Sequence, residues 1–183
     1  MAVGIGSMTG SLGIVVSRKK PGHFVALSED GRIDAVLSQG GKLADLLEKR
    51  AAINVKEAQR GPNDGSALSP AGTVKTVDPY DVTIAMPAAD GEPVVSDAER
   101  DAWSRMRVSY DVIVDAPPFK LGGTLMLLAS QDPGSLAERG TDLFVPLFNP
   151  HIEVAGLTLR DVPRDSVLVN RSHIRRVTAL TKR

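Results

Sequence analysis

Residues 24–37 read Phe-Val-Ala-Leu-Ser-Glu-Asp-Gly-Arg-Ile-Asp-Ala-Val-Leu, and this stretch sets the fold class of the chain. Two apolar runs, residues 24–27 and 33–37, flank a turn that has Asp30-Gly31 at its centre. Asp-Gly between two such runs is the strongest short-range signal for a β-hairpin. The sequence therefore predicts that this part of the chain is a pair of antiparallel strands.

The rest of the first half continues as strands after one short helix. Leu43, Leu46 and Leu47 have the i, i+3 and i+4 spacing of an amphipathic helix, which we expect over residues 42–50. Further strands are expected at residues 53–55, 73–77 and 82–86. We therefore expect a first small β-barrel over residues 23–87, followed by a Pro-containing linker over residues 88–95.

The second half begins with a helix and then returns to strands. Ser96 precedes acidic residues, so it is a good N-cap for a short helix. Gly122-Gly123 predicts a bulge or sharp bend within a strand, and Pro146 predicts that its strand lies at an edge or ends there. We expect residues 96–183 to form a second small barrel with a leading short helix. Its strands are predicted at residues 110–114, 121–128, 143–148, 152–159, 166–170 and 174–180.

The two halves repeat the same order of elements. Residues 31–37, 42–47 and 52–55 align with residues 119–125, 135–138 and 143–147, and residues 77–84 align with residues 162–169. Identity between the halves is low, so chance similarity of two all-β stretches is the alternative. The order of strand, turn, strand, short helix, strand, loop and strand suits a small, strongly bent five-stranded barrel. The fold class that we predict is therefore mainly β, with two such barrels in tandem and short helices.

Three runs in the second half resemble bacterial Sm-like small-barrel domains. They are Lys120-Leu121-Gly122-Gly123-Thr124-Leu125, Phe144-Val145-Pro146-Leu147 and Leu168-Val169-Asn170-Arg171-Ser172-His173-Ile174. The last run looks like the second Sm signature, in which a strand ends in a tight basic turn and the next strand begins with isoleucine. The first half matches more weakly, because it has Ala85-Met86-Pro87 in place of that turn. The resemblance implies a tandem of Sm-like barrels.

The basic turn is the candidate nucleic-acid site. In Sm-like rings the corresponding turn lines a pore that holds single-stranded RNA, so the resemblance implies RNA contacts here. The candidate residues are Asn170, Arg171, His173, Arg175 and Arg176. The chain has only four Phe, two Tyr and one Trp, so it supplies few platforms on which bases could stack. A turn that forms hydrogen bonds within the protein is the alternative.

Catalytic and metal sites are not predicted. The chain has no cysteine, which excludes disulfides, thiolate catalysis and cysteine-based metal centres. His23, His151 and His173 are isolated and lack the spacing of metal ligands, and no Gly-x-Ser-x-Gly motif occurs. We therefore expect neither an enzyme nor a cofactor, and no small-molecule substrate is evident.

Charge and hydropathy fit a cytoplasmic protein. The chain has 183 residues, and 22 basic side chains balance 22 acidic ones, so no strong field attracts nucleic acid or anionic lipid. The longest apolar runs, such as residues 125–129, are far shorter than a membrane span. No basic leader precedes the first apolar segment, which argues against a secretory signal. Residues 1–22 are expected to be a flexible or pairing arm.

Two functions remain as hypotheses. The first is a non-catalytic oligomerisation or protein-assembly module, because small barrels expose strand edges that a neighbouring subunit can pair with. Its partner would be a second copy of this chain or another protein subunit. The alternative is an Sm-like regulator that binds single-stranded RNA.

Overall fold

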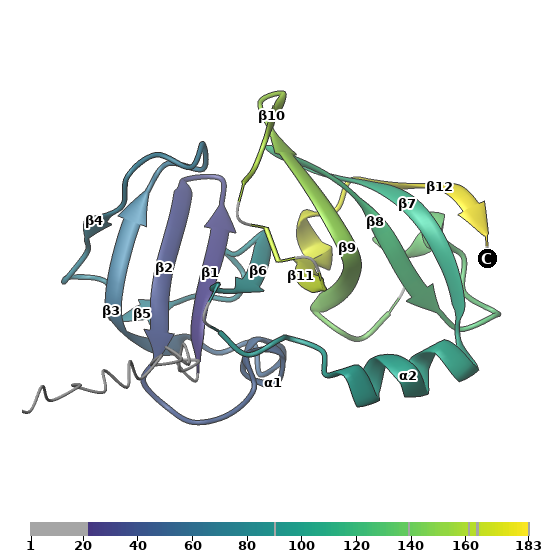
Figure 1. The fold of residues 1–183 in the computed structure, drawn as a ribbon, viewed down its shortest axis with the longest axis horizontal. Helices are drawn as coiled ribbons and strands as arrows, with labels where there is room; N and C mark the ends of the chain where they lie inside the picture. Colours follow the sequence, from purple (N-terminus) through teal and green to yellow (C-terminus); the bar gives the residue numbers. More distant parts are fainter. Residues whose placement is uncertain (1–21, 90, 139, 161, 164, 183) are drawn as a thin grey trace, which may run out of the picture.

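The structure of the chain, a computed structural model, describes residues 22–89, 91–138, 140–160, 162–163 and 165–182 (Figure 1). These residues form a mainly β protein, which confirms the fold class at that level. The arm predicted over residues 1–22 lies outside them, apart from Gly22. In the described chain, no helix has the length and apolar character needed to cross a membrane.

The first half contains the predicted hairpin. Its elements, within the described residues, are β1 (His23–Ser28), β2 (Gly31–Leu37), α1 (Leu43–Glu48), β3 (Ile53–Gly61), β4 (Ser69–Pro70), β5 (Thr76–Val77) and β6 (Ile84–Pro87). Strands β1 and β2 are antiparallel, with Ser28 opposite Gly31, so the loop is Glu29-Asp30 and the glycine opens β2. Gly31 has a φ of 133°, and a Cβ there would lie 2.6 Å from the carbonyl oxygen of Gly61. Close approach of β3 therefore requires glycine at this position.

The second half begins with the predicted helix. Its elements, within the described residues, are α2 (Asp97–Met106), β7 (Val108–Ala116), β8 (Phe119–Leu127), the 3₁₀ helix η1 (Pro133–Ser135), β9 (Phe144–Val154), β10 (Leu157–Thr158), β11 (Ser166–Asn170), the 3₁₀ helix η2 (Arg171–His173) and β12 (Arg176–Lys182). Ser96 is the N-cap of α2, as predicted. Its hydroxyl accepts a hydrogen bond from the Glu99 amide, and the Glu99 carboxylate accepts one from the Ser96 amide at 2.9 Å. This reciprocal pair is a capping box, which fixes where the helix starts.

The predicted bulge lies in β8. The register between β8 and β9 shifts between Gly122 and Thr124, which confirms the prediction. A Cβ at Gly123 would lie 2.7 Å from Leu147 Cγ, whereas a Cβ at Gly122 would come no closer than 3.9 Å to His151. The close approach of the two strands therefore depends on Gly123 rather than on its neighbour.

Pro146 does not mark an edge strand. Strand β9 lies between β8 and β11, so the prediction of an edge is wrong for the strand as a whole. The ladder between β8 and β9 stops at the pair of Thr124 and Phe148, and Pro146 pairs only with Leu168 of β11. Proline has no amide hydrogen, so it fits where a strand is paired on one side only.

The strands form one continuous antiparallel sheet. Among the described residues it has twelve strands in the order β12-β7-β8-β9-β11-β6-β1-β2-β3-β4, with β10 on β9 and β5 on β3. Figure 1 shows β4 and β12 at opposite ends of the molecule. The halves meet where β11 pairs with β6, Leu168 opposite Ala85 and Val169 opposite Ile84. The sheet is open along this path, so two closed barrels in tandem are not confirmed.

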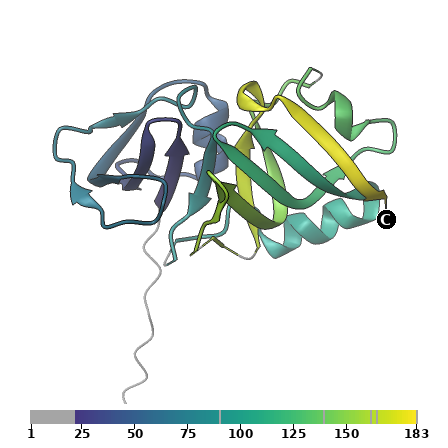
Figure 2. The same ribbon diagram turned by 90° about the horizontal axis from the view of Figure 1, so that it is seen from above.

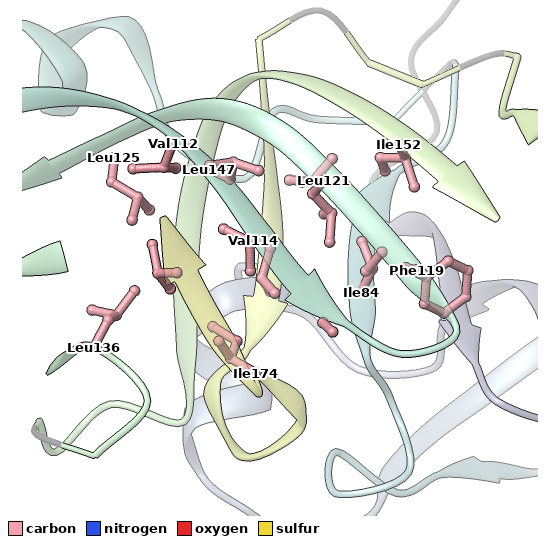
Figure 3. Packing of buried hydrophobic residues seen from close by; sticks show 14 of the residues in the cluster. Ile84, Val112, Val114, Phe119, Leu121, Leu125, Leu136, Leu147, Ile152 and Ile174 are labelled. Carbon is pink, nitrogen blue, oxygen red and sulfur yellow. The ribbon is translucent and has the colours of Figure 1, made fainter. Parts of the chain in front are cut away.

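The strands at the junction separate two hydrophobic cores. Strands β1, β6 and β11 are buried along most of their length. Alternate residues of β1 and β6 join the core of the second half, where Figure 3 shows Ile84 near Phe119 and Val114. The other residues of β1 and β6, such as Phe24 and Ala85, point to the opposite face and join the core of the first half. The two halves therefore share one wall.

Strand pairing shows how the halves correspond. The meander β7-β8-β9 repeats β1-β2-β3, and β12 pairs with β7 as β6 pairs with β1. The predicted alignment of residues 77–84 with residues 162–169 is therefore wrong. It matches the start of β6 with β11, but β11 pairs with β9, and the strand that corresponds to β6 is β12. The counterpart of β11 in the first half is the segment with β4 and β5, which pairs with the outer side of β3.

Candidate functional site

The predicted RNA-binding turn begins at a buried asparagine. Asn170 is 0% exposed. Its Nδ2 donates hydrogen bonds to the carbonyl oxygens of Pro79, at 3.0 Å, and Val82, at 2.8 Å. Its Oδ1 accepts from the amide of Ser172 at 3.0 Å and from its hydroxyl at 2.6 Å. The side-chain amide thus uses its full hydrogen-bonding capacity inside the protein, and it ties the turn to the loop of the first half.

His173 makes a second link to the same loop. Its Nε2 lies 2.7 Å from the carbonyl oxygen of Tyr80, and its Nδ1 lies 3.2 Å from Oγ1 of the buried Thr83. Because a carbonyl oxygen can only accept, Nε2 carries a hydrogen and donates it to Tyr80, and Nδ1 forms the second hydrogen bond with the Thr83 hydroxyl. Both ring nitrogens therefore have partners within the protein.

The three arginines differ in exposure. Arg171 is partly buried, and its Nη2 donates to the carbonyl oxygen of Gly140 at 2.6 Å. Arg175 and Arg176 are exposed at the start of β12. The structure therefore gathers Asn170 and His173 around the loop of residues 79–83 and leaves two arginines in solvent. RNA contact by the five residues stays a prediction.

Strand β12 has a partner on one side only. It pairs with β7 from Arg176 opposite Asp115 to Lys182 opposite Tyr110. In the part of the chain that is described, neither another strand nor a backbone hydrogen bond from a loop reaches its other side. Figure 2 shows β12 in yellow beside β7 at the end of the molecule. Leu180 lies at the bulge and is 62% exposed. The helix η1 contacts β12, but no strand pairs with it opposite β7 among the described residues, so its unpaired amide and carbonyl groups could take another strand.

A groove lies between α1, α2 and the start of β9, with a volume of about 220 Å³. Its apolar lining consists of Ala44, Val94, Val95, Trp103, Phe144, Pro146 and Leu168. The ring of Trp103 packs edge-on against Phe148, with centroids 6.1 Å apart. The guanidinium of Arg107 lies over the Trp103 ring, 4.2 Å from its centroid, in a cation–π contact.

Charged residues fix the two helices around this groove. Lys42 Nζ lies 2.7 Å from Glu99 Oε1, which joins the start of α1 to α2. Hydrogen bonds from Lys42 and from the residue that caps α2 lower the pKa of Glu99 to about 2, and the same ion pair raises the pKa of Lys42. Glu48, at the end of α1, accepts hydrogen bonds from the amides of Leu143, at 2.9 Å, and Phe144, at 2.6 Å. These contacts attach α1 to the start of β9.

Comparison of the chain with protein-family models, curated proteins and solved structures finds no match. Across the described residues, no group of three or more His, Asp or Glu side chains is placed to hold a metal ion. The geometry of the chain itself therefore carries the assignment of function.

The sequence did not predict the groove. Its walls come from three separate segments, residues 42–48, 94–107 and 142–146, together with Leu168. The only local signal is Trp103, the sole tryptophan of the chain, on a helix with no fully buried residue. A large aromatic side chain on such a helix indicates a contact surface, but it does not reveal the other walls.

Proposed function

We propose that this chain is a non-catalytic assembly module in which the free side of β12 takes a strand from a second copy. The observation that carries the proposal is a difference between corresponding strands. Strand β6 is paired on both sides, with β1 and β11, whereas β12 is paired with β7 alone among the described residues. An unpaired strand side is a template for pairing with another chain.

The contact between the two halves suggests how copies would join. Inside the chain, β11 of the second half pairs with β6 of the first. The counterpart of β6 is β12, and the counterpart of β11 is the segment of residues 69–77 beside β3. Repeating the internal contact would join β12 of one copy to residues 69–77 of the next. Such a head-to-tail contact produces a ring if it closes and a filament if it does not.

The tandem small-barrel arrangement is part of the same proposal. Two hydrophobic cores support it, each formed mainly by one half and completed by side chains of the other. The repeated meander also supports it, and a bulge interrupts the strands in each half. One lies between Asp34 and Val36 in the β2–β3 pair, and the other at Gly123 in β8. By the resemblance to Sm-like domains, such barrels assemble through their strand edges.

The alternative is a regulator that binds single-stranded RNA through the basic turn. Its support is the exposure of Arg175 and Arg176, whose side chains can reach phosphate. It predicts binding that weakens as salt is raised and that falls when both arginines become alanine. The internal hydrogen bonds of Asn170 and His173 account for these two residues without RNA.

Light scattering after size-exclusion chromatography, at two protein concentrations, tests the assembly proposal. We expect a mass above the 19.4 kDa of one chain that rises with concentration. Leu180→Asp should weaken association roughly tenfold or more, equivalent to about 1.4 kcal/mol. Leu157→Asp is the matched control, because Leu157 is 61% exposed against 62% for Leu180 but lies on β10.

Three results would count against the proposal. A monomer whose mass is insensitive to dilution contradicts it. Association that Leu180→Asp leaves unchanged shows that copies meet at another surface. Absorbance at 260 nm that ribonuclease removes would instead favour the RNA-binding alternative.

A further inference from the structure

The groove between α1 and α2 has apolar walls and an acidic rim. Trp103 and Pro146 are partly exposed in its wall, above the buried side chains of Phe144 and Leu168. Four carboxylates line it against two cations, and these six residues are Asp45, Glu48, Glu99, Asp142, Lys42 and Arg107. A segment that combines apolar side chains with neighbouring positive charges would complement both features.

The N-terminal part of this chain contains such a segment. Residues 12–16 read Leu-Gly-Ile-Val-Val, and residues 18–20 read Arg-Lys-Lys. Both runs lie outside the described residues. Four apolar side chains are followed within a few positions by three positive charges, which is the order that the walls and rim of the groove would match.

The described chain begins close to the groove. Gly22 lines a small cavity together with Lys42 and Val94, and the same two residues line the groove. Figure 1 shows the start of β1 at the end of the sheet where α1 lies. Six residue steps separate residue 16 from residue 22, and an extended chain spans about 20 Å over that length. The apolar run can therefore reach the groove of its own chain.

We propose that residues 12–16 occupy the groove between α1 and α2 of the same chain, with residues 18–20 beside its acidic rim. Attachment to the same chain gives the segment a high effective concentration at this site, so its affinity as a free peptide need not be high. The proposal does not depend on the assembly through β12, since it concerns another surface.

Trp103 reports directly on the groove because it is the only tryptophan. In the chain of residues 1–183, Ile14→Asp should expose the indole, shift its fluorescence emission to longer wavelength and increase quenching by acrylamide. Ile5→Asp is the matched control, with the same change outside the apolar run, and should leave emission unchanged. A synthetic peptide of residues 10–21 should restore the emission of the Ile14→Asp protein and have no effect on the wild type.

A second variant tests the acidic rim. Asp45 and Asp142 are exposed, so replacing both with lysine should preserve the fold and reproduce the fluorescence shift of Ile14→Asp. Leu180→Asp should keep wild-type emission, which separates this proposal from the one on assembly. Equal emission from wild type, Ile14→Asp and Ile5→Asp, with no response to the peptide, would overturn the proposal. A wild-type signal that is lost on dilution together with the oligomer would overturn the same-chain assignment in favour of a second copy.

Discussion

Replacing Asn170 with alanine is expected to destabilise the fold by about 2 to 6 kcal/mol. The change removes the Nδ2 donor from two buried residues, since Pro79 and Val82 each lose a hydrogen bond to their carbonyl oxygens. Leaving a buried acceptor without its partner costs about 1 to 3 kcal/mol. The bond to Ser172 adds little, because that residue is exposed and water can replace the lost partner.

Urea and thermal unfolding measure this loss. For a chain of this size, each kcal/mol lowers the melting temperature by about 2 to 4 °C, so the drop should be at least roughly 4 °C. Asn54→Ala is the control, because Asn54 is exposed on β3 and its replacement should cost less than about 0.5 kcal/mol. Equal stability of the two variants would refute the structural role of Asn170. A role in RNA binding alone would instead lower RNA affinity and leave unfolding unchanged.

Further predictions concern a strand contact and an ion pair. Gly123→Ala should destabilise the protein by about 1 to 3 kcal/mol in urea unfolding, because the new Cβ would lie 2.7 Å from Leu147 Cγ. Gly122→Ala is the control and should be nearly neutral. Equal losses of stability in the two variants would contradict this account. The hydrogen bond from Lys42 lowers the pKa of Glu99 from 4.5 to about 2, so the ionised carboxylate stabilises the fold above pH 4.5, and this contribution is lost as the pH falls towards 2. For so exposed a pair, the difference in unfolding free energy between wild type and Glu99→Gln should stay below about 1 kcal/mol and shrink over that interval. A difference that is constant with pH would refute the role of the charge.

Local sequence signals predicted local structure. The hairpin of β1 and β2, the N-cap at Ser96 and the bulge at Gly122-Gly123 each depend on neighbouring residues, and each is present. Pro146 was misleading because a proline signals a missing amide hydrogen, not the position of the whole strand. Strand β9 loses its β8 partner just where the proline stands, so a central strand can contain it.

The pairing of β11 with β6 could not be predicted from the sequence. Both strands are buried on both faces, so neither shows the apolar and polar alternation that fixes which side faces a core. The role of the turn at Asn170 could not be predicted either. Its polar residues marked it as a candidate site, but the carbonyl oxygen of Pro79 that accepts from Asn170 lies 91 residues away in the sequence. From the sequence alone, a turn that binds a ligand cannot be told apart from a turn whose polar side chains bind a loop 91 residues away.

Amide hydrogen exchange of the wild-type protein, measured by mass spectrometry at low and high concentration, tests the assembly through β12 most directly. The account predicts that residues 176–182 and residues 69–77 gain protection together as the mass rises, while β7 changes little because its amides are already paired within the sheet. An oligomer that forms without added protection at β12 would contradict the account.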